Sequence, residues 1–112
     1  MVKKNYSNIK KVVNQFIKTI EKDIKVKEVI LFGSYVKGNV TPASDIDLIV
    51  VSPDFRRKDE MEAIQYLFRQ AAKVNSLLEP IPATPEEIKK ADPRDFLGQV
   101  IKSGKVIWSM PK

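Results

Sequence analysis

The sequence predicts an α+β fold in which helices pack on one face of a small mixed β-sheet of three to four strands. Two long segments carry apolar residues at three- and four-residue steps, which is typical of amphipathic helices. Short β-branched runs lie between and after these segments and end at glycine, serine or proline, as strands do. A chain of 112 residues can bury one core, so we expect a single domain over residues 1–112.

The first helix is predicted over residues 6–23 and the second over residues 58–74. Their apolar stripes are Ile9, Val12, Val13, Phe16, Ile17, Ile20 and Ile24, and then Met61, Ile64, Leu67, Phe68, Ala71 and Ala72. Between the helices we expect, in order, a strand at residues 26–32, a short helix at 34–37, a loop at 39–44 and a strand at 45–51.

A third strand is predicted over residues 76–82, and its two prolines indicate where it lies in the sheet. Residues two apart in a strand point their N–H groups to the same edge. Pro80 and Pro82 therefore lack donors on one side, which predicts a strand at the edge of the sheet.

The C-terminal part is predicted to form two short helices and a last strand. Thr84-Pro85-Glu86-Glu87 has the pattern of a capped helix start, and Asp92-Pro93-Arg94-Asp95 indicates another. The second of these helices would carry Phe96, Leu97, Val100 and Ile101 and stop at Gly104. A short strand is expected over residues 105–108.

The composition excludes several kinds of chemistry. The chain has no Cys and no His, so it has no thiol nucleophile, no imidazole base and no zinc site built on these residues. Any metal must bind to carboxylates, which favours hard ions such as Mg²⁺ or Mn²⁺. The longest apolar runs are four residues, too short for a membrane span, and no signal peptide is evident, so we expect a cytoplasmic protein.

All of the excess positive charge lies at the start of the chain. Residues 1–27 hold eight Lys and two acidic residues, whereas residues 28–112 are neutral, and the chain as a whole carries +6. A solvated helix face explains this pattern, and so does a docking surface for an acidic protein or a nucleic acid. The segment is poor in aromatic residues for base stacking, which argues against nucleic acid.

Gly33-Ser34 directly follows a predicted strand and precedes a predicted helix. Glycine allows a tight turn and a close backbone approach, and the exposed N–H groups would face an anion. Ser34 can add a hydroxyl and Lys37 a positive charge. On their own these residues also suit an ordinary turn.

Asp45 and Asp47 lie two residues apart on a predicted buried strand, so their carboxylates point to the same face. Such a pair repels and loses hydration, and a divalent cation would remove both costs. The alternative is that the pair caps a neighbouring helix or forms ion pairs with Lys and Arg. Glu79 is the leading candidate for a third acid, because it is the polar residue of an apolar strand; a solvent-facing charge is its other explanation, and Glu86 and Glu87 are its rivals.

The stretch GSYVKGNVTPASDIDLIV resembles the signature of the minimal nucleotidyltransferases, within the polymerase-β-like nucleotidyltransferase superfamily. The resemblance implies the nucleotidyltransferase fold and transfer of a nucleoside monophosphate, expected to be AMP from ATP, with release of pyrophosphate. By similarity, Gly33 and Ser34 would hold the β- and γ-phosphates. Asp45 and Asp47 would bind two Mg²⁺ ions, and Glu79 would place one metal or take the acceptor proton.

The resemblance also implies a partner. Larger relatives append an acceptor-binding domain, whereas minimal members pair with a helical HEPN-type toxin and add AMP to its tyrosine, acting as the antitoxin. We therefore expect a HEPN-type protein partner and no membrane, and leave a homo-oligomer open. The alternatives are a non-catalytic subunit that neutralises its partner by binding alone, and a nucleic-acid-binding protein that uses the Lys-rich helix.

Overall fold

The computed structural model describes residues 2–38, 40–41 and 43–111, and within these ranges side chains from Asn8 onward. Asn39 and Pro42, which belong to the predicted loop, lie outside the described residues. The elements in chain order are α1 (Val2–Ile20), β1 (Glu28–Phe32), α2 (Ser34–Lys37), β2 (Ile46–Val51), the 3₁₀ helix η1 (Pro53–Arg57), α3 (Glu60–Ala72), β3 (Leu78–Ala83), α4 (Pro85–Lys90), α5 (Phe96–Ser103) and β4 (Lys105–Ser109). Only η1 was not expected from the sequence.

The four strands form one mixed sheet in the order β3-β2-β1-β4. β1 is antiparallel to both β2 and β4, and β2 is parallel to β3. β3 lies at an edge, as Pro80 and Pro82 predict. The expected α+β class with a small mixed sheet is therefore confirmed.

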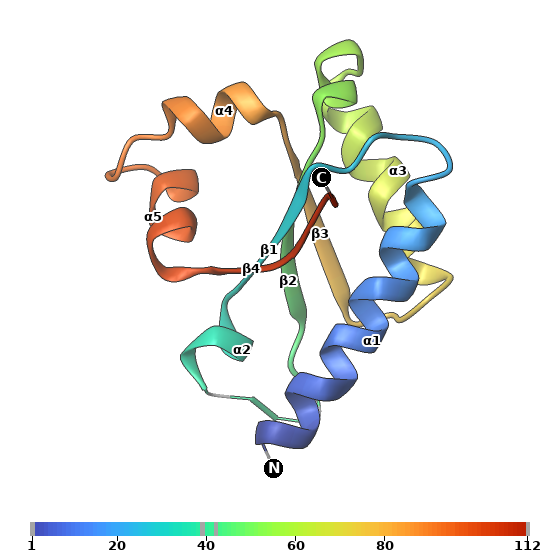
Figure 1. The fold of residues 1–112 in the computed structure, drawn as a ribbon, viewed down its shortest axis with the longest axis vertical. Coiled ribbons are helices and arrows are strands. Elements are labelled where there is room, and N and C mark those ends of the chain that lie inside the picture. The colour runs from blue at the N-terminus through green and yellow to red at the C-terminus, as the bar shows by residue number, and fades with distance from the viewer. Residues whose placement is uncertain (1, 39, 42, 112) are drawn as a thin grey trace.

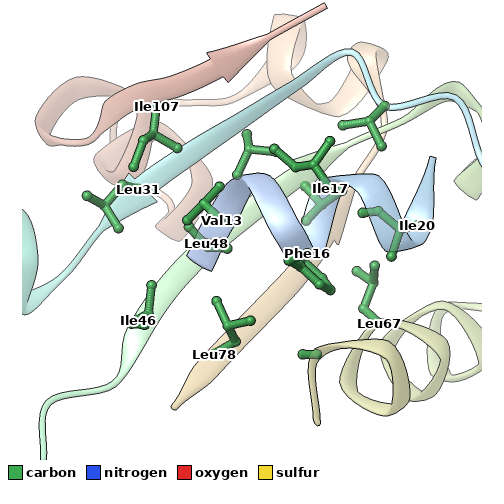
Figure 2. Packing of buried hydrophobic residues seen from close by; sticks show 14 of the residues in the cluster. Val13, Phe16, Ile17, Ile20, Leu31, Ile46, Leu48, Leu67, Leu78 and Ile107 are labelled. Atoms are coloured by element: carbon green, nitrogen blue, oxygen red, sulfur yellow. The ribbon is translucent and has the colours of Figure 1, made fainter. Parts of the chain in front are cut away.

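The larger core lies on one face of the sheet, under α1 and α3 (Figure 1). Figure 2 shows Phe16 and Ile20 of α1 beside Leu67 of α3, in one cluster with Leu48 and Leu78 of the sheet. All five side chains are buried, so this face supplies most of the hydrophobic stabilisation. The lysines at positions 10, 11 and 18 stay exposed on the other side of α1.

The opposite face carries a smaller core that the sequence did not place. Ile30, Ile49 and Val51 of the sheet pack with Val100 of α5 and Ile88 of α4. α4 and α5 lie on the side of the sheet away from α1 and α3 (Figure 1). The expected packing of helices on one face holds for the two long helices only, and α4 and α5 correct it: they cover the other face, because Ile30, Ile49 and Val51 are apolar there too.

Local signals explain both short helices. The Thr84 hydroxyl accepts a hydrogen bond from the Glu87 N–H at 3.1 Å, and the Glu87 carboxylate accepts one from the Thr84 N–H at 2.8 Å. This is the predicted capping box. α5 is capped by Asp95, whose carboxylate accepts from the Gly98 N–H at 2.9 Å, and it ends at Gly104.

Replacing Phe16 tests the main core, since its side chain is 0% exposed between α1 and the sheet. Phe16→Ala should lower the free energy of unfolding by about 3–5 kcal/mol, because it removes a buried ring and leaves a cavity. Phe68→Ala is the matched control: this ring on α3 is 43% exposed, and its loss should cost about 1 kcal/mol or less. Urea unfolding of both variants measures the difference, and equal losses would contradict the packing described.

Candidate active site

The site begins where β1 ends and the backbone turns at Gly33. Gly33 has φ 77° and ψ −144°, a conformation that side chains with a Cβ disfavour. Its carbonyl accepts hydrogen bonds from the N–H groups of Val36 and Lys37, both at 3.0 Å, and so starts the single turn of α2. Gly38, with φ 86°, ends that turn.

Asp47 of β2 lies directly against this turn. The register of the sheet places Asp47 opposite Phe32, the residue before Gly33. A Cβ on Gly33 would lie 2.3 Å from the Asp47 Oδ2 atom, far inside van der Waals contact. The backbone conformation therefore favours glycine at this position, and any Cβ here would displace the carboxylate beside it.

Glu79 reaches the same site from β3. In the parallel pair of β2 and β3, Glu79 is the register partner of Asp47, so both side chains leave the same face of the sheet. Asp45 stands one residue before β2, and its carboxyl group lies within hydrogen-bonding reach of Glu79. The structure thus brings Asp45, Asp47 and Glu79 together at one end of the sheet.

The pKa values of Glu79 and Asp47 are both raised in this cluster. Loss of hydration, a hydrogen bond with Asp45 and the charges of Asp45 and Asp47 together raise the pKa of Glu79. Burial and then the charge of Asp45 raise the pKa of Asp47. Such a cluster concentrates negative charge where a cation would be stabilised.

One part of the expectation is corrected. The sequence places both aspartates on a buried strand, but β2 begins only at Ile46, and Asp45 is exposed while Asp47 is partly buried. The buried part of β2 is its apolar stretch, and the acidic pair sits where the strand emerges into solvent. Hydration therefore offsets part of the repulsion that the sequence alone implies.

The carboxylates suit a hard divalent cation in their chemistry, because all available donors are oxygen atoms. Among the residues that the structure describes, no three acidic side chains are already arranged to hold an ion. Asp45 and Glu79 are both exposed, so packing does not hold either side chain in one rotamer. The residues fit Mg²⁺ by donor type and by charge.

The remaining predicted residues lie on α2. Ser34 follows Gly33 and is partly buried at the first turn, whereas Lys37 is exposed at the last. The rivals for the third acid lie elsewhere. Glu87 belongs to the capping box, and Glu86 forms an ion pair with Arg56 beyond the far end of β2.

Comparison with known proteins identifies the family of the chain. The family model described as "Nucleotidyltransferase domain" matches residues 11–105. The chain belongs to the nucleotidyltransferase family. It is similar to two proteins of Methanocaldococcus jannaschii whose names describe them as candidate protein adenylyltransferases: MJ0604, 27% identical over 90% of this chain and 99% of the relative, and MJ1215, 36% identical over 53% of this chain and 72% of the relative.

Solved nucleotidyltransferases share the fold. A crystal structure of a candidate nucleotidyltransferase from Sulfolobus solfataricus matches with a TM-score of 0.70 at 16% identity, covering 96% of this chain and 86% of that one. A crystal structure described as a toxin-antitoxin with AMP-PNP matches with a TM-score of 0.60 at 26% identity, covering 87% and 73%. Among the described residues of our nucleotidyltransferase, no helix is both long and apolar enough to cross a membrane.

The two glycines of the turn offer a matched test. Gly33→Ala should lose most nucleotide transfer, because the new methyl group displaces the Asp47 carboxylate. Gly38→Ala also strains a positive φ, yet a Cβ there meets nothing within 4 Å. Each variant should lose about 1–3 kcal/mol of unfolding free energy. Only Gly33→Ala should lose transfer when the assay temperature keeps both variants folded. If Gly33→Ala is as active as Gly38→Ala, Gly33 is not part of the active site.

Proposed function

We propose that this nucleotidyltransferase is Mg²⁺-dependent and transfers AMP from ATP to a tyrosine hydroxyl of a HEPN-type partner protein, which silences that partner as an antitoxin does. The observation that carries the proposal is the meeting of Asp45, Asp47 and Glu79 beside the Gly33 turn. Asp47 and Glu79 leave the same face of two neighbouring strands, and Asp45 adds a third carboxylate just before β2. Such a group of carboxylates is what a phosphoryl-transfer site without His or Cys requires.

In this proposal the turn at Gly33 receives the triphosphate. With no side chain at Gly33, phosphate oxygens can approach the backbone closely. Ser34 adds a hydroxyl donor, and Lys37 adds a flexible positive charge one helical turn away. These groups bind and orient the β- and γ-phosphates, so that the α-phosphorus lies over the carboxylates.

Asp45 and Asp47 would hold the Mg²⁺ ions, with Glu79 as a third ligand or as the base for the acceptor. When bound, the ions supply charge neutralisation for the phosphates and for the leaving pyrophosphate. The tyrosine oxygen forms a bond to the α-phosphorus while the bond to the β-phosphate oxygen breaks. The tyrosine proton passes to a carboxylate or to water, and pyrophosphate leaves with the electron pair.

The nature of the acceptor is supported by similarity. The relatives in Methanocaldococcus jannaschii carry names that describe protein adenylyltransferases. Two solved neighbours at 26% and 28% identity are toxin–antitoxin complexes, and the first contains AMP-PNP, an analogue of ATP. A further neighbour at 25% identity carries two aspartates two positions apart changed to glutamate. These likenesses favour ATP as donor and a toxin protein as acceptor.

Asp45→Asn and Asp47→Asn should each reduce AMP transfer at least about a hundredfold at saturating Mg²⁺, because each removes a charged ligand. Both variants should remain folded, since the loss of one negative charge relieves repulsion. Asp59→Asn is the matched control: Asp59 caps α3 by accepting from the Met61 N–H at 3.2 Å, and asparagine caps equally well.

Mass spectrometry of the co-purified partner is the measurement. Wild-type protein and Asp59→Asn should leave an added adenylate on the partner, and EDTA should abolish it. If the partner is silenced without any adduct, AMP transfer is wrong and the chain neutralises its partner by binding alone. If labelled AMP is found on RNA or on a small molecule, the proposed protein acceptor is wrong, but the nucleotidyltransferase activity stands.

Glu79→Gln should lower kcat about a hundredfold or more and leave ATP affinity within a few-fold, if Glu79 acts on the acceptor or on one metal. Glu87→Gln is the control, because glutamine also completes the capping box of α4. Single-turnover transfer and ATP binding, measured separately, distinguish the two effects. A Glu79→Gln enzyme as fast as the control would remove Glu79 from the mechanism.

A further inference from the structure

An aromatic ring stands exposed at the start of α5, close to the candidate active site. Phe96 is 56% exposed, although the sequence pattern assigns it to the apolar stripe of that helix. Its ring packs edge-to-face against Phe32, with ring centroids 5.7 Å apart and an interplanar angle of 79°. This contact covers only part of Phe96 and leaves the rest of the ring to solvent.

The partner ring links Phe96 to the carboxylates. Phe32 precedes Gly33 and lies opposite Asp47 in the antiparallel pair of β1 and β2, so both side chains leave the same face of the sheet. Glu79 lies beside Asp47 on that face. The aromatic pair is therefore adjacent to the acidic cluster. Phe68 is the other exposed aromatic residue among the described side chains, and it lies on α3, which packs on the opposite face.

The start of α5 is held firmly by the turn before it. Gly98 packs so closely against that turn that a Cβ there would lie 1.8 Å from the Asp92 carbonyl oxygen. The Asp95 N–H donates to the same carbonyl at 2.9 Å, and the Asp95 carboxylate caps the helix. An exposed ring on a fixed backbone loses little conformational freedom when a ligand covers it.

We propose that Phe96 is the stacking platform for the base of the nucleotide, with Phe32 supporting the ring from its edge. The inference rests on the proposed function, since it uses the triphosphate placed at the Gly33 turn. A nucleotide held there by its phosphates must direct its nucleoside away from the turn, and Phe96 offers the exposed aromatic surface next to it. Stacking accepts any base, so Phe96 supplies affinity and orientation.

Comparison of ATP with inorganic tripolyphosphate isolates the base. Phe96→Ala should weaken ATP binding by about five- to a hundredfold, the range of one lost base–aromatic stack, and leave tripolyphosphate binding unchanged. Phe96→Leu should resemble Phe96→Ala although it keeps apolar contact with Phe32, and Phe96→Tyr should resemble wild type. Calorimetry on the full chain with Mg²⁺ measures both ligands, and thermal unfolding checks each variant.

Two controls complete the design. Ile101→Ala removes another exposed apolar side chain from α5 and should leave both affinities unchanged. Phe96→Trp places an indole on the platform, and its fluorescence should be quenched by ATP and not by tripolyphosphate. The natural Trp108 packs with the core on the α1 side of the sheet, so ATP should leave wild-type fluorescence nearly constant.

The outcomes distinguish failure of the Phe96 stacking proposal from failure of the proposed AMP transfer. Equal weakening of ATP and tripolyphosphate by Phe96→Ala would overturn the platform and indicate a distorted phosphate site. Unchanged ATP binding combined with weaker partner binding would overturn it in favour of a protein contact. A wild-type protein that shows the Phe96-dependent ATP binding but transfers no AMP would support the platform and refute the proposed reaction.

Discussion

The rest of the site depends on the close contact between the backbone of Gly33 and the carboxylate of Asp47. A Cβ at Gly33 would displace the Asp47 carboxylate, and the positive φ of Gly33 would strain any other residue, so the turn favours glycine here. The turn fixes where α2 begins, and the register of the sheet places Phe32 opposite Asp47. The register of β3 against β2 then places Glu79 beside Asp47.

One face of the sheet provides most of the stability, and the other gives ligands access to the acidic groups. α1 and α3 cover one face with large, fully buried side chains such as Phe16 and Leu67, and so hold the central strands rigidly. On the other face, α4 and α5 bury Ile49 and Val51, farther along β2 than Asp47. The end of that face nearest the turn stays open, which leaves acidic groups on a stiff support but within reach of solvent and ligands.

Much of this arrangement is encoded in local signals. The apolar stripe of α1, the capping residues around Thr84 and the paired prolines of β3 act over a few residues, so the sequence predicts them directly. The spacing of Asp45 and Asp47 likewise predicts a shared face. The face chosen by α4 and α5, the solvent exposure of Asp45 and the uncovered ring of Phe96 depend on which distant elements pack together. A stripe of apolar residues specifies the side of a helix that is buried, but not how fully a neighbour covers each residue.

The acidic cluster is open to solvent, and this exposure suits the proposed reaction. Asp45 and Glu79 lie within hydrogen-bonding reach of each other and are exposed to solvent, where water would compete for an activated phosphate. A nucleotide with its cations would separate the two carboxylates and neutralise them, and an acceptor protein seated over the open face would exclude water. Assembly of the site would then require donor, cation and acceptor together, so that ATP is spent mainly when the partner is present.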